Sequence, residues 1–281
     1  MLWFEGRLVE GATVPFDLSD RGLTLGDGVF DTALCLGGRI AFEAEHVTRL
    51  VAAAAHLGFA VPRPTVETAM RALAGACPQA AIRTTLTRGT GPRGLAPPPD
   101  PRPSLWASAA PLRPGTAFAP LSLLPVETRR NETSVCSRLK TLGYLDAVLA
   151  ARDAAQAGFD EALFLNTRGA VACAGTGNLF ALKGECLVTP PLRDGALDGI
   201  MRSRILLHAA ECGLRVEETA QPLSAYADAD AVVLTNSLRL IAPVSAIGIW
   251  NIPSVDHPVV ARLTQAVRRD VTGACGVSGI P

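Results

Sequence analysis

The hydrophobic pattern of the first half of the chain predicts a sheet covered by two helices. Short apolar runs at residues 2–5, 7–10 and 29–36 are separated by glycine-containing turns, which is typical of antiparallel strands. Apolar residues then recur at helical spacing over residues 43–57. A second helix is expected over residues 64–76, because it opens with proline and has glutamate in its first turn.

Two further apolar runs, residues 80–87 and 104–110, read as strands that flank a long loop. The loop, residues 88–103, is rich in glycine and proline. It is too long for a simple hairpin connection, and loops of this length in compact domains usually carry function. We therefore expect it to present residues that contact a ligand.

A second stretch rich in proline and glycine, residues 111–120, is the best candidate for a linker. A patterned strand resumes at Leu121. The predicted organisation is a smaller N-terminal domain (residues 1–112), a linker (113–120) and a larger C-terminal domain (121–281).

The second half mixes helices and strands without a regular βαβ repeat. Helices are predicted over residues 139–157, 200–212 and 257–275, and the first two end at Gly158 and Gly213. The predicted strands lie at residues 162–165, 170–173, 177–182, 186–188, 214–217 and 231–235. This order predicts an α+β fold of two domains and argues against a Rossmann or TIM-barrel fold.

Composition narrows the class of protein. The 281 residues are 48% hydrophobic and 19% charged, and 26 basic residues balance 26 acidic ones. This balance does not favour a nucleic-acid partner. No apolar run approaches the length of a membrane span, and the first residues do not resemble a signal peptide, so we expect a cytoplasmic protein. Seven scattered cysteines without a Cys-x-x-Cys pair indicate neither a disulfide framework nor a zinc or other metal site.

The basic residues are 24 arginines and only two lysines, Lys140 and Lys183. Arginine cannot replace lysine as a nucleophile, because its guanidinium stays protonated, whereas a desolvated lysine can form an imine with a carbonyl. Chance survival at the surface is the alternative, and it suits Lys183, which lies in a predicted hairpin turn. Lys140 is expected at the start of an apolar helix and is the candidate catalytic amine.

Other segments could hold an anion. His46 and Arg49 share one helix face, although such a pair is more often a packing or salt-bridge feature. Residues 198–201 place backbone N–H groups at a helix start, where an anion is favoured, and residues 235–237 end a strand with hydroxyl and amide donors. An amine, an arginine and two donor loops together suit a phosphorylated aldehyde cofactor.

The order of several sequence blocks resembles the class IV family of pyridoxal-phosphate enzymes over essentially the whole chain. This family includes branched-chain aminotransferases, D-amino-acid aminotransferases and 4-amino-4-deoxychorismate lyases. The matching blocks are Leu25-Gly26-Asp27-Gly28-Val29-Phe30, His46-x-x-Arg49-Leu50, Arg88-Gly89-x-Gly91-x-Arg93-Gly94, Lys140-Thr141-Leu142, Asn178-Leu179-Phe180, Gly199-Ile200-Met201-Arg202 and Thr235-Asn236-Ser237.

The resemblance implies the two-domain fold of the D-amino-acid aminotransferase type, with a small α/β domain and a larger domain containing a barrel-like sheet. It also implies a homodimer, a small-molecule amine substrate and pyridoxal 5′-phosphate as cofactor. Lys140 would form the Schiff base and move protons. The residues that would hold the cofactor phosphate are Arg49, the main chain at Ile200 and Met201, Asn236 and Ser237.

Within the family the sequence is most similar to the lyase branch, which converts 4-amino-4-deoxychorismate to 4-aminobenzoate and pyruvate in folate biosynthesis. Arg93 would then bind a substrate carboxylate, and Thr32 is a candidate second catalytic group. Two positions depart from the family pattern. Cys173 stands where a glutamate pairs with the pyridine nitrogen, and Leu95 replaces an aromatic residue typical of lyases.

The cysteine favours the lyase, because an aromatising elimination needs a weaker electron sink than a transamination does. The alternatives are an aminotransferase acting on branched-chain or D-amino acids, and a homologue that binds the cofactor without turnover. Retention of Lys140 argues against the last of these.

Overall fold

The computed structural model describes residues 1–11 and 13–281 of the chain. These residues form two compact units. The first contains Met1–Arg113, Lys140–Gly143 and Val271–Ile280, and the second contains Pro114–Leu139 and Tyr144–Asp270. The strand-free segment between residues 112 and 120 is where the linker was expected. The domain boundaries themselves stay a prediction, and Lys140–Gly143 groups with the first unit although it lies beyond the expected linker.

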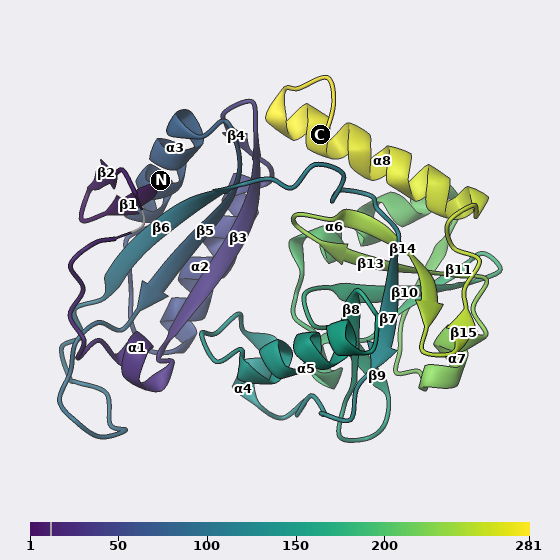
Figure 1. Cartoon of the computed structure of the whole chain (residues 1–281), viewed down its shortest axis with the longest axis horizontal. Helices are drawn as coiled ribbons and strands as arrows, with labels where there is room; N and C mark the ends of the chain where they lie inside the picture. The colour runs from purple at the N-terminus through teal and green to yellow at the C-terminus, as the bar shows by residue number, and fades with distance from the viewer. Residues whose placement is uncertain (12) are drawn as a thin grey trace. The chain divides into compact units, whose positions relative to one another are not determined.

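The first unit is built on a six-stranded antiparallel sheet with the order β2-β1-β6-β5-β3-β4 (Figure 1). Its two long central strands, β3 (Gly28–Leu36) and β5 (Gln79–Thr87), pair along their whole length from Gly28–Thr87 to Leu36–Gln79. The remaining strands are β1 (Leu2–Phe4), β2 (Arg7–Val9), β4 (Arg39–Ile40) and β6 (Ser104–Pro111).

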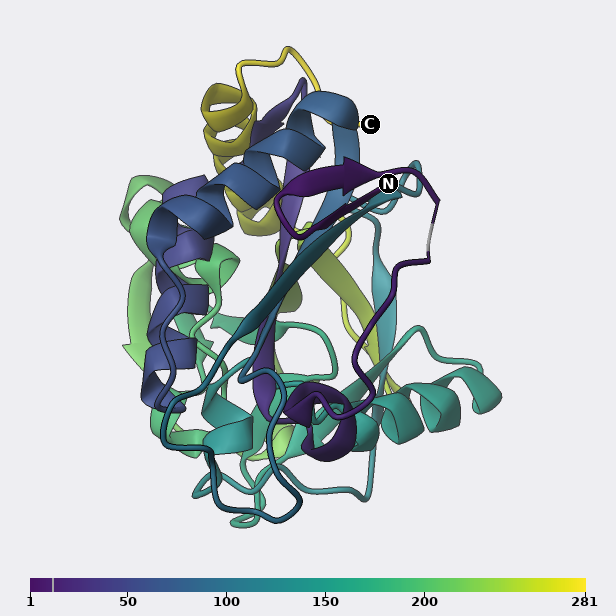
Figure 2. The ribbon, with the colours of Figure 1, turned by 90° about the vertical axis from the view of Figure 1, so that its left-hand side faces the viewer.

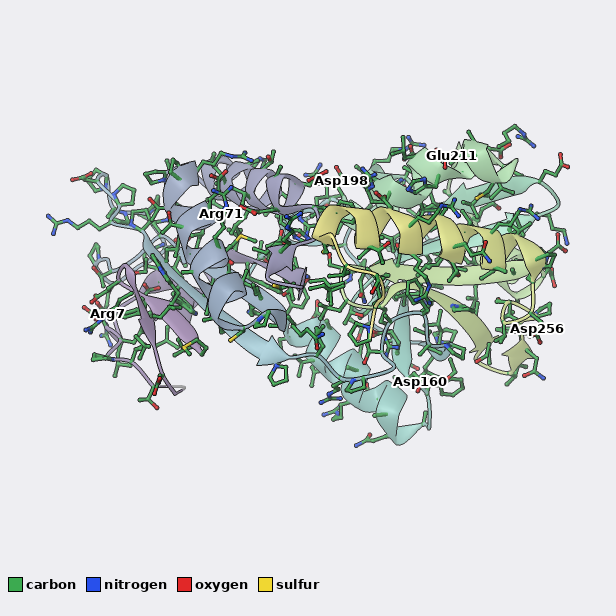
Figure 3. The ribbon with its side chains drawn as sticks, turned by 90° about the horizontal axis from the view of Figure 1, so that it is seen from above. Arg7, Arg71, Asp160, Asp198, Glu211 and Asp256 are labelled. Atoms are coloured by element: carbon green, nitrogen blue, oxygen red, sulfur yellow. The ribbon has the colours of Figure 1, made fainter. Side chains whose placement is uncertain are left out.

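Two amphipathic helices pack on this sheet, as the hydrophobic spacing predicts. Helix α2 (Glu43–His56) contacts β3, and α3 (Arg63–Ala76) contacts β5 and β6 (Figure 2). Their buried sides are aliphatic, with Leu50 and Leu73 almost fully covered. Arg71 of α3, labelled in Figure 3, pairs with Glu43 of α2 at 2.7 Å, so the two helices are also joined at their exposed edges.

A short helix, α1 (Arg21–Leu25), precedes β3 and has no counterpart in the prediction. Its N-cap is Asp20, which is 1% exposed. One carboxylate oxygen of Asp20 accepts from the Gly22 amide at 2.7 Å, and the other accepts from the hydroxyls of Thr87 and Ser104 at 2.8 and 2.9 Å. A single carboxylate therefore joins α1 to β5 and β6 at the two ends of the long loop.

The second unit contains a nine-stranded mixed sheet. Eight strands follow the order β12-β11-β10-β13-β14-β7-β8-β9, and the ninth, β15, pairs with β14. The pairs β14–β7, β7–β8 and β11–β12 are parallel and the others antiparallel. The strands are β7 (Leu121–Pro125), β8 (Glu161–Leu165), β9 (Val171–Ala174), β10 (Asn178–Lys183), β11 (Cys186–Thr189), β12 (Arg215–Glu218), β13 (Ala231–Asn236), β14 (Leu240–Ile247) and β15 (Trp250–Asn251).

The helices of the second unit differ from expectation at one important place. Helix α5 (Leu145–Gln156) begins later than predicted, so Lys140 is not at a helix start. Before Lys140 lies a separate single-turn helix, α4 (Val135–Arg138). The other helices are α6 (Ile200–Ala209), which continues as a short 3₁₀ turn to Cys212, α7 (Leu223–Ala227) and α8 (Pro258–Cys275). Strand β14 and helix α7 have no counterpart in the prediction.

An aliphatic core lies on one face of the second sheet and includes Leu123, Leu163, Leu234 and Ile247. A smaller cluster joins α5 to β8 and β9 through Ala150, Phe164 and Cys173. The curled sheets, one antiparallel and one mixed, and their helices confirm the predicted α+β architecture. Among the described residues, no helix combines the length and apolarity that crossing a membrane requires.

We expect Asp20→Ala to destabilise the protein by about 2–4 kcal/mol, because it removes a helix cap and leaves buried donors unpaired. Urea unfolding near neutral pH measures this change. The control is Asp17→Ala, which removes an exposed carboxylate that accepts hydrogen bonds from the amide and hydroxyl of Ser19. Equal unfolding midpoints for the two variants would show that Asp20 does not anchor the loop.

Candidate functional site

Lys140 lies in an extended segment that pairs with the edge of β3. The Phe30 amide donates to the Lys140 carbonyl at 2.9 Å, and the Leu142 amide donates to the Gly28 carbonyl at 3.0 Å. An isolated antiparallel bridge joins Val29 to Thr141 between these bonds. The main chain of the candidate lysine is therefore held by the sheet of the first unit, and not by a helix.

The side chain of Lys140 lies against an aromatic ring on this sheet. Its Nζ is 4.4 Å from the centroid of the Phe30 ring, and the guanidinium carbon of Arg83 is 3.6 Å from the same centroid. Because side chains alternate along a strand, Thr32 projects from the same face of β3 as Phe30. The first unit thus places Lys140, Phe30 and the predicted Thr32 along one side of β3.

The other side of β3 carries a buried charge cluster that includes Arg49. Asp31 accepts from Nε and Nη2 of Arg49 at 2.8 Å each, and its Oδ1 lies 2.8 Å from Nδ1 of His46. Burial alone would raise the pKa of Asp31, but the charges and hydrogen bonds of His46 and Arg49 outweigh it and hold that pKa well below its usual range. His46 and Arg49 share a helix face as predicted, and Asp31 fixes the orientation of the guanidinium.

The long loop is anchored by two arginines that share one carboxylate. Asp27 accepts from Nε of Arg21 at 2.9 Å and from Nε of Arg88 at 2.7 Å. Arg21 also donates to the carbonyls of Gly94 and Leu95, at 3.0 and 2.9 Å. Arg93 is exposed directly beside these carbonyls. The backbone on the C-terminal side of Arg93 is therefore fixed while its own side chain faces solvent.

Gly89, at the start of the long loop, lies very close to the backbone at the loop's other end. Its φ is +83°, and a Cβ placed there would lie 1.8 Å from the Arg102 carbonyl oxygen. Only glycine allows the two ends of the loop to approach this closely. The glycine in the Arg88-Gly89 block is therefore needed for loop closure.

In the second unit, the first turn of α6 presents backbone N–H groups that have no acceptor within the helix itself. Gly199 is its N-cap and provides no side-chain hydrogen bond to the helix. Asn178 of β10 holds this turn by donating from Nδ2 to the Leu197 carbonyl at 2.8 Å, and a Cβ at Gly199 would lie 2.0 Å from Asn178 Oδ1. The amides at Ile200 and Met201 stand at the positive end of the helix, shortly after Asp198 in the sequence.

The end of β13 lies beside the start of β10, because Thr235 is the registered partner of Asn178. Among the described residues, the Thr235 hydroxyl is buried and has no hydrogen-bond partner. The side chain of Asn236 forms hydrogen bonds with other groups of the protein. Its Oδ1 accepts from the amides of Leu238 and Arg239, at 3.0 and 2.7 Å, and its Nδ2 donates to the Thr176 hydroxyl at 3.3 Å.

This end of the second sheet fits a phosphate group. A helix N-terminus without a side-chain cap and a buried hydroxyl that has no partner among residues 1–11 and 13–281 are the donors that such an anion requires. The sequence indicated residues 235–237 as a donor segment but assigned the phosphate only to Asn236 and Ser237, and the structure adds the Thr235 hydroxyl to these candidates. Because the side-chain amide of Asn236 already bonds to protein groups, Ser237 and the main chain are the more suitable phosphate donors of residues 235–237.

Cys173 lies on β9 and is 8% exposed. Burial raises the pKa of its thiol, and the neighbouring Arg130 opposes this shift through its charge and a hydrogen bond. A buried thiol with a raised pKa is neutral near pH 7. The strand position that carries glutamate in the resembled family therefore holds no negative charge here. Arg130 lies 43 residues before Cys173 in the sequence, so no local pattern connects the two residues.

Comparison with known proteins identifies the class. The model of the family described as amino-transferase class IV matches residues 28–247. The chain is 32% identical over 249 residues to a putative branched-chain-amino-acid aminotransferase of Methanocaldococcus jannaschii, covering 86% of each chain. It is 30% identical over 280 residues to an aminodeoxychorismate lyase of Vibrio harveyi, covering 95% of this chain and 98% of that one.

Among solved structures, the 4-amino-4-deoxychorismate lyase of Pseudomonas aeruginosa superposes with a TM-score of 0.87 at 28% identity, covering 96% of this chain and 99% of that one. The chain belongs to the class IV aminotransferase family. The predicted family and fold are thereby confirmed, and the protein is an enzyme of this aminotransferase and lyase family. The family depends on pyridoxal phosphate, which confirms the predicted cofactor.

The Asp31 cluster generates a prediction about acid stability. Because its folded-state pKa is lowered, Asp31 contributes stability that is complete above about pH 5 and is lost as the pH falls below about 4. Asp31→Asn should cost about 3–5 kcal/mol near neutral pH, since the buried His46 and the half-buried Arg49 lose their partner. The gap between variant and parent should narrow in acid.

Urea unfolding at a series of pH values measures both parts of this prediction. The control is Asp153→Asn, whose carboxylate pairs with Arg152 on an exposed face of α5. The prediction is contradicted if the free energies of unfolding of Asp31→Asn and the parent differ by a constant amount throughout the acid range.

Proposed function

We propose that this enzyme is a lyase that converts 4-amino-4-deoxychorismate to 4-aminobenzoate and pyruvate. The observation that carries the proposal is the neutral, buried thiol of Cys173, where an acid would strengthen electron withdrawal by the cofactor. The end-to-end likeness to an aminodeoxychorismate lyase supports it. In this elimination the bond between the ring carbon and the enolpyruvyl oxygen breaks and the ring becomes aromatic, so less help is needed from the cofactor than in transamination.

Each predicted residue has a distinct task under this proposal. The Lys140 amine would attach the cofactor and take a proton from the substrate ring. The amides at Ile200 and Met201, together with Ser237 and Thr235, would hold the phosphate. The guanidinium of Arg49, oriented by Asp31, would add positive charge to that group. When bound, pyridoxal phosphate withdraws electrons from the carbon that bears the substrate amine.

Arg93 and Thr32 would act on the substrate. A guanidinium can bind both oxygens of a carboxylate, and 4-amino-4-deoxychorismate carries two carboxylates. Arg21 holds the loop beside Arg93, so the arginine can reach outward without loss of its backbone position. Thr32 projects along the same face of β3 as Phe30 and is proposed as a second proton-carrying group.

The decisive experiment is an assay of the purified enzyme with 4-amino-4-deoxychorismate, beside a panel of branched-chain and D-amino acids with keto acids. The proposal expects release of 4-aminobenzoate to exceed every transamination rate. The aminotransferase alternative, which the archaeal relative favours, expects the opposite order. Absence of both activities in a cofactor-loaded protein would support a non-catalytic homologue.

Lys140 should carry the cofactor covalently. Borohydride reduction of the loaded enzyme, followed by peptide mapping, should place the label on Lys140, because it is the lysine held against β3. Lys183 is an internal control, since its Nζ is 2.9 Å from the Asp228 carbonyl in an exposed hairpin. Label on Lys183, or none on a protein that binds cofactor, would overturn this assignment.

Arg93→Met should lower kcat/KM by about 30-fold to several thousand-fold, the loss expected when one partner of a charged pair worth about 2–5 kcal/mol is removed. The absorption of the bound cofactor should not change. Arg102→Met is the matched control, because Arg102 is another exposed arginine at the far end of the same loop. Cofactor loss in the Arg93 variant alone would assign this arginine to the cofactor instead.

The homodimer expected from the resemblance also remains a proposal. Leu145, Val148 and Leu149 are exposed on one face of α5, at the spacing of neighbours on a helix surface. Such a face suits a second copy of the chain. Sedimentation analysis of the parent and of Val148→Glu tests it, and a monomeric parent would refute it.

A further inference from the structure

Arg130 is fastened to the second sheet by both its main chain and its side chain. Its amide donates to the Leu165 carbonyl at 2.9 Å, and its backbone forms a parallel bridge with Asn166. Its guanidinium carbon lies 4.2 Å from the centroid of the Phe164 ring. A guanidinium stacked on an aromatic ring and tied at its backbone has a well-defined position.

This position brings the guanidinium next to Cys173. Phe164 of β8 and Cys173 of β9 are registered antiparallel partners, and such partners project from the same face of a sheet, with Cβ atoms about 5 Å apart. Arg130 therefore covers the neighbour of Cys173, and it also donates a hydrogen bond to the thiol. A cation thus accompanies the neutral thiol at the place where the resembled family has a carboxylate.

The acid that interacts with Cys173 is Glu161, at the start of β8. Its side chain is directed elsewhere, because Oε2 accepts from the Thr176 hydroxyl at 2.5 Å and Oε1 accepts from the Ala162 amide at 3.1 Å. Burial raises the pKa of Glu161, although these hydrogen bonds and Arg239 partly oppose that shift. Glu161 is bound to the turn after β9 and does not replace the missing carboxylate.

We infer that Arg130 and Cys173 keep the pyridine nitrogen of bound pyridoxal phosphate unprotonated. Guanidinium and thiol groups donate hydrogen bonds, and an unprotonated ring nitrogen accepts one. A protonated nitrogen would face other donors and a like charge, which lowers its pKa. The inference rests on the proposed function in one respect, namely that Cys173 faces the cofactor ring.

Arg130 is thereby a residue that tunes the cofactor, and it acts in the direction that the elimination requires. An unprotonated ring withdraws electrons weakly, which disfavours transamination while leaving an aromatising elimination possible. The charge of Arg130, and not only the loss of glutamate at position 173, would then separate this enzyme from aminotransferases of its family.

The test is ¹⁵N magnetic resonance of enzyme loaded with pyridoxal phosphate labelled at the ring nitrogen. The parent should show the resonance position of an unprotonated pyridine near neutral pH. Arg130→Met should move the resonance toward the protonated position or raise the pH at which it titrates, because the like charge is gone. Arg130→Lys retains the charge and should stay close to the parent.

Arg152→Met is the matched control, since it removes an exposed arginine of α5 and should leave the resonance unchanged. Cys173→Glu should give the protonated position. Glu161→Gln should have no effect, and a shift in that variant would show that Glu161 is the acid that serves the ring. A protonated nitrogen in the parent would overturn the inference directly, even if the Arg130→Met variant failed to fold.

The two proposals fail separately. An unprotonated nitrogen in an enzyme that does not release 4-aminobenzoate would refute the proposed function and retain the role of Arg130. Release of 4-aminobenzoate by an enzyme whose ring nitrogen is protonated would do the reverse. An unchanged resonance in both Arg130→Met and Cys173→Glu would show that this pair does not face the ring.

Discussion

The position of Lys140 depends on the pairing between residues 140–142 and the edge of β3. Strand β4 pairs only with the far end of β3, at Cys35 and Leu36, so the backbone near Gly28 and Phe30 needs another partner. Backbone polar groups of a folded protein are almost always paired, and Lys140 and Leu142 supply the partners here. A helix running through Lys140 would use its carbonyl internally and leave this edge of β3 unpaired. The sheet therefore decides where the amine is presented.

The partners of charged side chains differ between the two units. In the first, two carboxylates are each shared by two cationic or basic side chains: Asp31 by His46 and Arg49, and Asp27 by Arg21 and Arg88. These clusters hold the loop and the α2 face through several directed bonds, which arginine supplies better than lysine because its donors form a rigid planar fork. In the second unit, Cys173 and Arg130 reverse the pattern, since a cation stands there beside a neutral thiol.

Family membership leaves the reaction open, because class IV enzymes share a cofactor and differ in what they do with it. The features that separate a lyase from an aminotransferase are local. They are the electron demand at the ring nitrogen, set by the groups around Cys173, and the recognition of a carboxylate-bearing substrate, proposed for Arg93. Both would change activation free energies by a few kcal/mol, which is enough to change a product ratio while leaving the fold unaltered.

The sequence by itself determined the helices α2, α3, α6 and α8, most strands, the cofactor and the family, because periodicity and short motifs are local signals. It also determined that Lys140 is chemically unusual, since only one other lysine exists. It did not determine that Lys140 pairs with β3, that the Asn236 side chain bonds to the turn that follows it, or that Arg130 lies beside Cys173. Those facts depend on contacts between segments far apart in the chain. Hydrogen-bond pairing across strands and burial select such contacts, and neither is written in the spacing of neighbouring residues.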